Sequence, residues 1–180
     1  METVDQTYRS NEDRRRWYAV YTGFRKEKSV CRELAKYGIE AYVPVIKKVR
    51  QYRRKVKEYE LPLISHYVFV RIHQSERSRV LNARDVFRFV GFGGRPSPIP
   101  EEEIALLQRI TGEINEVEAM PLQDLNEGSE VEVIGGALTG LRGTVRSKTG
   151  KHRLLIDLKN IGYTLSLEVP AKYLRILKRA

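Results

Sequence analysis

The chain is poor in cysteine and histidine. Its 180 residues hold one cysteine, Cys31, and three scattered histidines, His66, His73 and His152. A single cysteine leaves no internal disulfide, and the lack of a cysteine pair argues against a thiolate zinc site. Cys31 lies at helical spacing among apolar residues, which favours a core position over a reactive thiol. We therefore expect no bound metal.

Patterns typical of enzymes are also missing. No phosphate-binding loop of the form Gly-x4-Gly-Lys-[Ser/Thr] occurs. Gly91–Gly94 ends a strand-like run and lacks the helix start that follows a dinucleotide-binding glycine motif. Glu101–Glu103 are better explained as the acidic first turn of a helix than as a catalytic carboxylate cluster. The sequence therefore predicts no enzyme and no cofactor.

Long hydrophobic segments are absent. No apolar run approaches the roughly 20 residues needed to cross a bilayer. The first residues are polar and lack the apolar core of a secretion signal. We therefore expect a cytoplasmic protein that does not engage the membrane. The hydrophobic fraction of 41% argues against a disordered chain.

Positive charge is what the chain has in excess. The formal net charge is +10. Residues 14–57 carry fifteen Lys and Arg against three Asp and Glu, residues 101–127 carry one against eight, and residues 128–180 are again basic. Two basic modules separated by an acidic stretch favour a nucleic-acid or acidic partner, with solubility alone as the alternative.

The first module is predicted to follow a flexible tail over residues 1–15 and to occupy residues 16–112. β-branched and aromatic runs, helical spacing and glycine and proline breaks define its elements. Strands are expected over 17–21, 41–49, 56–61, 66–72 and 86–90, and helices over 25–37, 75–83 and 101–111. The order β-α-β-β-β-α-β-α predicts an α+β sandwich with a basic hairpin tip within 47–57.

The second module is predicted to be all β. Residues 113–127 are acidic without a clear period and are expected to be a linker. Residues 128–180 contain five short strand-forming runs, over 130–134, 142–147, 153–158, 164–169 and 174–177. Five short strands in so few residues predict a small barrel, which leaves no long sheet edge exposed.

Motifs in both modules occur in a specific order. The first set is Arg16–Tyr21, Leu61–Val70, Phe89–Gly93 and Arg95–Pro100, and the second runs from Gly128 to Val145. Together they resemble the NusG family of transcription elongation factors over about residues 16–178. The resemblance implies a NusG N-terminal α/β sandwich, with an antiparallel sheet and flanking helices, followed by an SH3-like β-barrel, the KOW domain. Gly143 matches the characteristic glycine of the KOW motif, which also occurs in ribosomal proteins.

One departure separates this chain from the general pattern. The family often has Phe-Pro-Gly-Tyr before the central strand, where this chain has Ile64-Ser65-His66-Tyr67. With the long basic hairpin and the polar tail, this is similar to specialised paralogues such as RfaH and the UpxY antiterminators of capsule operons. The resemblance implies action at specific operons, such as those for surface polysaccharides.

The family's N-terminal domain carries a hydrophobic depression that binds the clamp helices of the RNA polymerase β′ subunit. Aromatic anchors suit such helix-in-groove contacts. The resemblance assigns the pocket to Tyr21, Ile64, Tyr67 and Phe92. It adds Tyr18 to the polymerase-binding set as a support, together with Trp17. Sheet core is the alternative for each, and it is favoured for Trp17 and Phe69. The segment that meets the polymerase β subunit in the family corresponds here to Ser75, Arg77, Ser78 and Arg79.

Nucleic-acid contacts are expected at two places. Arg25, Lys26 and Arg84 match positions that face the non-template DNA strand in specialised members. The hairpin is expected to hold upstream DNA or nascent RNA through Lys47, Lys48, Arg50, Arg53, Arg54, Lys55 and Lys57, which are interleaved with Tyr52. The alternative is a solvated basic hairpin without a ligand.

The KOW domain of relatives contacts ribosomal protein S10 or termination factor Rho, and in RfaH it changes fold and masks the polymerase site. Strand-favouring residues such as Val131, Val145 and Ile156 predict a barrel here. The whole pattern predicts a monomeric elongation or antitermination factor that binds RNA polymerase and suppresses pausing or termination. The alternative is a ribosome-associated or RNA-binding KOW protein.

Overall fold

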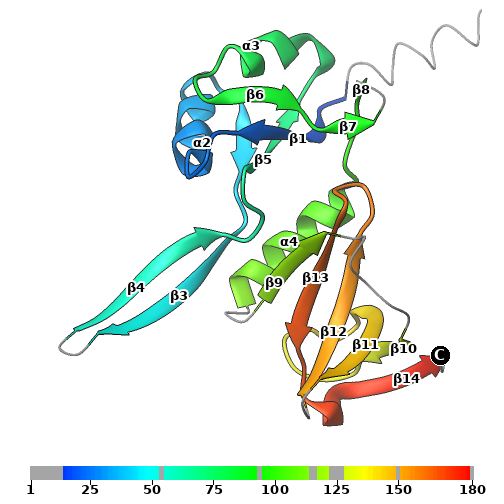
Figure 1. Cartoon of the computed structure of the whole chain (residues 1–180). Helices are drawn as coiled ribbons and strands as arrows, with labels where there is room; N and C mark the ends of the chain where they lie inside the picture. The colour runs from blue at the N-terminus through cyan, green and yellow to red at the C-terminus, as the bar shows by residue number, and fades with distance from the viewer. Residues whose placement is uncertain are drawn as a thin grey trace, which may run out of the picture. The chain divides into compact units, whose positions relative to one another are not determined.

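The chain divides into two compact units, each with its own antiparallel sheet (Figure 1). A computed structural model describes residues 14–52, 55–92, 95–113, 117–121, 128–148 and 151–178. Residues 1–44 and 64–105 belong to the first unit, and residues 45–63 and 106–180 belong to the second. Few helices accompany the sheets, so the α+β class predicted from the sequence is confirmed. No helix in the described part is long and apolar enough to cross a membrane.

The first unit is built on a four-stranded sheet of order β2-β5-β1-β6. Its strands are β1 (Arg16–Thr22), β2 (Glu40–Tyr42), β5 (Tyr67–Ile72) and β6 (Val86–Phe89). Its helices are α2 (Glu27–Lys36) and α3 (Arg77–Leu81), the latter preceded by the 3-10 turn η1 (Gln74–Glu76). Two short strands, β7 (Gly91–Phe92) and β8 (Arg95–Pro96), pair with each other beyond β6.

The core of this unit lies between the sheet and its two helices. Alternate residues of β1, Tyr18 and Val20, join Val30 of α2 and Val80 of α3 in one buried cluster, so both helices cover the same face of the sheet (Figure 1). Trp17 lies on the other face and is also buried, at 3% exposure. Because strands alternate, a strand buried on both faces shows a nearly continuous apolar run, as β1 does.

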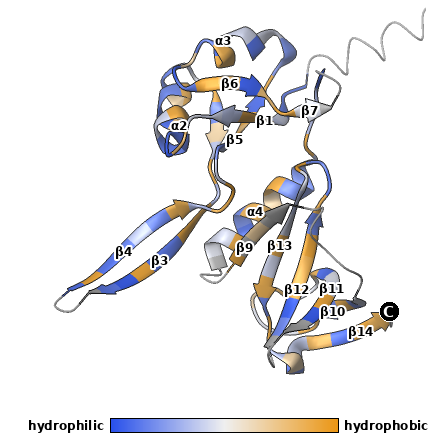
Figure 2. Cartoon of the chain, viewed as in Figure 1, coloured by the Kyte–Doolittle hydropathy of each residue, from blue (hydrophilic) through white to orange (hydrophobic). Residues whose placement is uncertain are grey.

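Pro44 divides a segment that the sequence pattern predicted as one strand over 41–49. β2 ends at Tyr42 and belongs to the first sheet, whereas β3 (Val45–Tyr52) pairs with β4 (Lys55–Pro62) in a separate hairpin. Proline has no backbone N–H to donate and a restricted φ, so it interrupts a sheet ladder. Both hairpin strands contain a mixture of hydrophobic and hydrophilic residues along their length (Figure 2).

The second unit contains a six-stranded antiparallel sheet of order β14-β10-β11-β12-β13-β9. Five strands correspond to the five predicted runs: β10 (Ser129–Val133), β11 (Arg142–Lys148), β12 (Lys151–Leu158), β13 (Tyr163–Glu168) and β14 (Leu174–Lys178). The sixth, β9 (Val117–Pro121), lies within the segment expected to be a linker and pairs with β13. Helix α4 (Glu101–Glu113) precedes β9.

Gly143 occupies a position where the second sheet has no room for a side chain. It lies opposite Val131 in the β10–β11 pairing, and a Cβ there would overlap the Leu155 carbonyl oxygen of β12. The glycine that defines the KOW resemblance is therefore required by close backbone packing.

Substituting Gly143 by alanine should destabilise the protein by about 1–3 kcal/mol, because the added methyl group forces the strands apart. Gly112 in α4 is a matched control, since a Cβ there meets nothing within 4 Å. Gly112→Ala should be neutral or stabilising by up to about 1 kcal/mol. Urea unfolding of both variants measures the difference, and equal stabilities would contradict the packing argument.

Glu132 forms an ion-pair triad across three strands of the second sheet. It lies opposite Arg142 of β11 and Arg175 of β14. Arg142 Nε is 3.3 Å from Glu132 Oε1, and Arg175 donates to Oε2. The hydrogen bond from Arg175, reinforced by Arg142, lowers the pKa of Glu132 below its ordinary value of 4.5.

Because the pKa of Glu132 is lower in the folded state, the triad stabilises the fold at pH values above the ordinary carboxyl pKa. This stabilisation is lost as the pH falls through the pKa of the folded state. Glu132→Gln should therefore lower the melting temperature at pH 7. The difference in melting temperature between Glu132→Gln and the wild-type chain should become smaller as the pH falls below about 4.5. Calorimetric scans from pH 7 to pH 3 test this, and a gap that stays constant with pH would assign the loss to packing.

Candidate functional site

Three turns meet at one end of the first sheet. They are 23–26 after β1, 64–66 before β5 and 82–85 before β6. The backbone N–H of Thr22 donates to the His66 carbonyl at 2.8 Å, and that of Gly23 donates to the Asp85 carbonyl at 3.0 Å. These hydrogen bonds fasten the turns to one another, so their side chains are presented from a rigid base.

Each of the three turns contains a non-glycine residue in the left-handed region. The φ angles are 58° at Arg25, 68° at His66 and 65° at Asp85. Such residues are uncommon and cluster at binding sites, because the surrounding structure must hold them in place. His66 is held by its backbone N–H, which donates to Glu27 Oε1 at 2.8 Å, and by contact of its Nδ1 with the Thr22 carbonyl at 3.1 Å.

An aromatic cluster of Tyr21, Phe24, His66, Tyr67 and Phe87 covers this end of the sheet. The Tyr21 ring stacks on His66 at 5.1 Å and meets Tyr67 edge-on at 6.1 Å. Phe24 is 65% exposed and Phe87 is 64% exposed. Large apolar rings are seldom left so open at adjoining positions unless a partner covers them.

A β-bulge places Phe87 in this cluster. The pairing of β1 with β6 steps from Tyr21–Arg88 to Thr22–Val86, so Phe87 is the extra residue. A bulge of this kind puts two successive side chains on the same side of the strand. Phe87 accordingly lies 6.5 Å from the Tyr21 ring, and the Arg88 guanidinium lies 5.3 Å from the same ring.

The structure divides the residues assigned to polymerase binding. Tyr21 and Tyr67 are half-exposed and adjacent. Tyr18 is part of the core beneath the helices and Ile64 is 1% exposed, so neither side chain lies on the surface where Tyr21 and Tyr67 meet. Phe69 is buried, as expected. The side chain of Phe92, in β7, lies outside the described part.

Sequence patterns did not single out Phe24, His66 or Phe87. Phe24 follows the strand in a turn, His66 was counted as the first residue of a strand, and the bulge breaks the alternation that would have placed Phe87. The one available signal is the density of aromatic residues at the strand ends.

The basic residues predicted in these turns lie side by side. Arg25, Lys26 and Arg84 are all exposed, in two turns joined through Gly23 and Asp85. The Arg25 guanidinium stacks 5.0 Å from the Phe24 ring, and Lys26 Nζ is 3.9 Å from an Asp85 carboxylate oxygen. A basic rim therefore borders the aromatic cluster.

The residues expected to meet the polymerase β subunit lie on η1 and α3. Ser75, Ser78 and Arg79 are exposed, and Arg79 is 3.9 Å from Glu76. The Arg77 guanidinium lies 5.5 Å from the Phe89 ring. These side chains form a polar surface along the outer side of the short helix.

The β3–β4 hairpin has two chemically different faces. Its register pairs Lys48 with Tyr59, Arg50 with Lys57 and Tyr52 with Lys55, so four cations lie on one side, the basic face: Lys48, Arg50, Lys55 and Lys57. Lys47 lies on the opposite side with Glu58 and Glu60, and its Nζ is 3.5 Å from Glu58. Of the predicted hairpin contacts, Arg53 and Arg54 lie outside the described residues.

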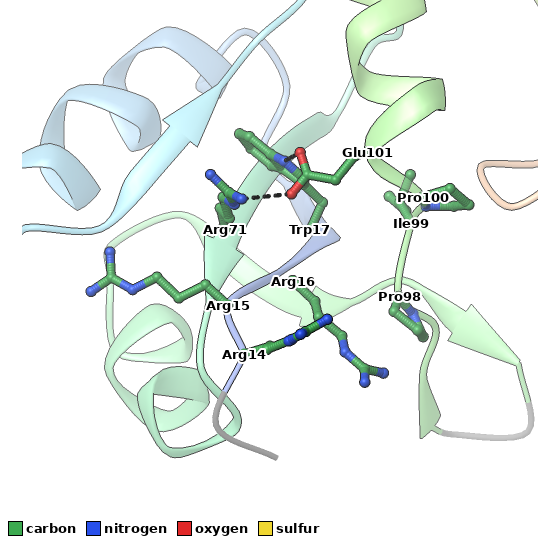
Figure 3. Close-up of a pocket in the computed structure, with 9 residues that line it drawn as sticks. All are labelled: Arg14, Arg15, Arg16, Trp17, Arg71, Pro98, Ile99, Pro100 and Glu101. Atoms are coloured by element: carbon green, nitrogen blue, oxygen red, sulfur yellow. Dashed lines mark hydrogen bonds and ion pairs between the residues drawn. The ribbon is translucent and has the colours of Figure 1, made fainter. Parts of the chain in front are cut away.

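A hollow of about 710 Å³ lies at the other end of β1 and is lined by arginines (Figure 3). Arg71 is 2.7 Å from one oxygen of Glu101, and the Trp17 indole N–H donates to the other at 3.0 Å. The carboxylate thus links two strands to the first turn of α4, which is a structural role. No group of three or more potential metal ligands occurs among the described residues.

A family model described as transcription termination factor nusG matches residues 15–108, which is more than half of the chain. This chain belongs to the NusG family. The family is one of transcription termination and antitermination factors and not of enzymes, as the sequence predicted.

Individual relatives agree with this membership. NusG of Borreliella burgdorferi, a transcription termination/antitermination protein, is 24% identical, over 89% of this chain and 97% of its own. The same protein of Thermus thermophilus is 25% identical, over 79% of this chain and 89% of its own. A solved structure concerning domain interaction in Thermotoga maritima NusG covers 93% of this chain and 99% of its own. Its TM-score of 0.55 at 18% identity shows a shared fold.

Proposed function

We propose that this NusG-family protein binds RNA polymerase through the aromatic cluster, which receives the clamp helices of the β′ subunit. The carrying observation is the ring surface at this end of the sheet, where partly exposed Tyr21 and Tyr67 end their strands beside exposed Phe24 in a turn. Aromatic side chains lose little conformational freedom on binding and bury large areas, so they are typical anchors for a helix in a groove. The basic rim would set the register of an acidic or polar helix.

Contact with the β subunit is proposed for the polar surface on η1 and α3. A factor that touches both sides of the DNA channel binds the closed clamp better than the open one. It thereby shifts the polymerase toward the closed, elongating state. The difference in binding free energy between the closed and open polymerase is then sufficient to suppress pausing or termination.

Nucleic acid is the second proposed partner. Arg25, Lys26 and Arg84 are placed to contact the non-template DNA strand next to the polymerase surface. The basic face of the hairpin is proposed to hold upstream DNA or nascent RNA. Arg50 lies directly opposite Lys57, so two cations stand side by side on this face.

Strands β10 to β14 of the second sheet, over residues 128–180, are proposed to form the KOW domain, an SH3-like barrel. The segment 113–127 before them is not wholly a linker, because β9 within it pairs with β13. Ribosomal protein S10 or Rho is the proposed partner of this domain. The protein is proposed to be a cytoplasmic monomer that acts at specific operons. The alternative, an RNA-binding KOW protein, leaves the aromatic cluster without a role.

Replacing Tyr67 by alanine should weaken binding to an isolated β′ clamp-helix fragment by about 1–3 kcal/mol, because a buried aromatic anchor is lost. Tyr37 is the matched control, since it is 51% exposed at the end of α2 and lies outside the cluster. Tyr37→Ala should bind as the wild-type chain does. Calorimetric titration measures both, and an unchanged affinity for a folded Tyr67→Ala variant would exclude this contact.

Removing two cations from the basic face, Lys55 and Lys57, should flatten the salt dependence of binding to elongation complexes. Each lost phosphate contact lowers the slope of log K against log salt by about 0.7–0.9. Lys47→Ala, on the opposite face of the same hairpin, should leave the slope unchanged. If all three substitutions act alike, the hairpin contributes only diffuse charge.

A further inference from the structure

A second hollow in the first unit lies along the outer edge of its sheet. β6 is one of the two edge strands, and the hollow of about 360 Å³ is bounded by β6, α3 and the short β7–β8 pair. Its lining includes Arg77, Phe87, Arg88, Phe89, Arg95 and Pro96. We call it the β6-edge groove.

The groove concentrates positive charge that nothing in the described structure neutralises. Three guanidinium groups line it, and none of the described lining residues is acidic. Arg77, Arg88 and Arg95 have no ion-pair partner among the residues that the structure describes. Two other arginines of this unit differ, since Arg15 and Arg71 contact glutamates. Three unpaired guanidiniums repel one another, which favours an anionic occupant.

Two of these guanidiniums are positioned by aromatic rings. Arg77 lies 5.5 Å from the Phe89 ring, and Arg88 lies 5.3 Å from the Tyr21 ring. A guanidinium stacked on a ring keeps its N–H donors in its own plane, where they match the oxygens of a phosphate. These contacts with aromatic rings orient the two guanidinium groups but do not neutralise their charge.

Phe87 supplies an apolar surface at the same place. It is 64% exposed and lines the groove next to Arg88. An exposed ring beside cations is the arrangement on which an unpaired base stacks while its phosphates are neutralised. A duplex has its bases stacked internally and offers no such face, and an acidic peptide needs the charges but not the ring.

We propose that the β6-edge groove binds a single strand of nucleic acid, with phosphates on Arg77, Arg88 and Arg95 and a base stacked on Phe87. This goes beyond the contacts at Arg25, Lys26 and Arg84. It concerns the protein alone with an oligonucleotide, and so it stands or falls separately from polymerase binding.

The test is fluorescence anisotropy of the full chain with labelled DNA and RNA strands on the order of ten nucleotides, and with the corresponding duplex. Phe87→Ala should weaken single-strand binding about tenfold and leave its salt slope unchanged. Arg95→Ala should reduce that slope by about 0.7. Arg32→Ala, which removes an exposed charge from α2, is the control and should change neither quantity. DNA and RNA arms identify the strand.

Three outcomes would overturn the proposal. They are no binding of any single strand, equal weakening of single-strand and duplex binding by Phe87→Ala, and wild-type single-strand affinity of a folded Phe87→Ala variant. Displacement of the strand by polyglutamate with the same dependence on Phe87 would assign the groove to an acidic protein instead. Titration of Arg95→Ala with the clamp-helix fragment keeps the two proposals distinguishable, because Arg95 lies outside the aromatic cluster.

Discussion

The first unit depends on one buried carboxylate. Glu27 is 3% exposed and accepts the backbone N–H of His66, which holds that residue at a φ of 68°. The His66 carbonyl then receives the Thr22 N–H, and its ring supports Tyr21. At the position where the family pattern has a glycine, this chain has His66 in the left-handed region, and the hydrogen bond offsets the cost of that conformation.

Charge in this protein serves two purposes that composition cannot separate. Arg142 and Arg175 hold Glu132 between neighbouring strands, whereas Arg88 and Arg95 contact no carboxylate within the described part. The two faces of the hairpin also differ in charge: Lys47 lies with Glu58, whereas Lys48 lies on the basic face. A shift of one residue along a strand moves a side chain to the other face. A net charge of +10 predicts an anionic partner, but only pairing geometry shows which cations remain for it.

Sequence patterns predicted the elements well because they depend on local periodicity. Alternation and β-branched runs located the strands of both sheets except β9, and Gly38, with a φ of 72°, ended α2 as expected. The candidate site was predicted less completely. The family motif indicated Tyr21. The position of Phe87 depends on a bulge and that of Phe24 on a turn, and neither feature follows a sequence periodicity. Strand β9 was missed because its partner β13 is distant in sequence.

The bulge at Phe87 explains how one small sheet presents two different surfaces. Without the extra residue, Phe87 and Arg88 would point to opposite faces of β6. With it, both rise on the Tyr21 side, so the ring and the guanidinium border the aromatic cluster and the β6-edge groove at once. Because Phe87 and Arg88 border both surfaces, they couple any ligands that occupy the two proposed sites. Occupation of one surface then changes the affinity of the other by an equal factor in each direction.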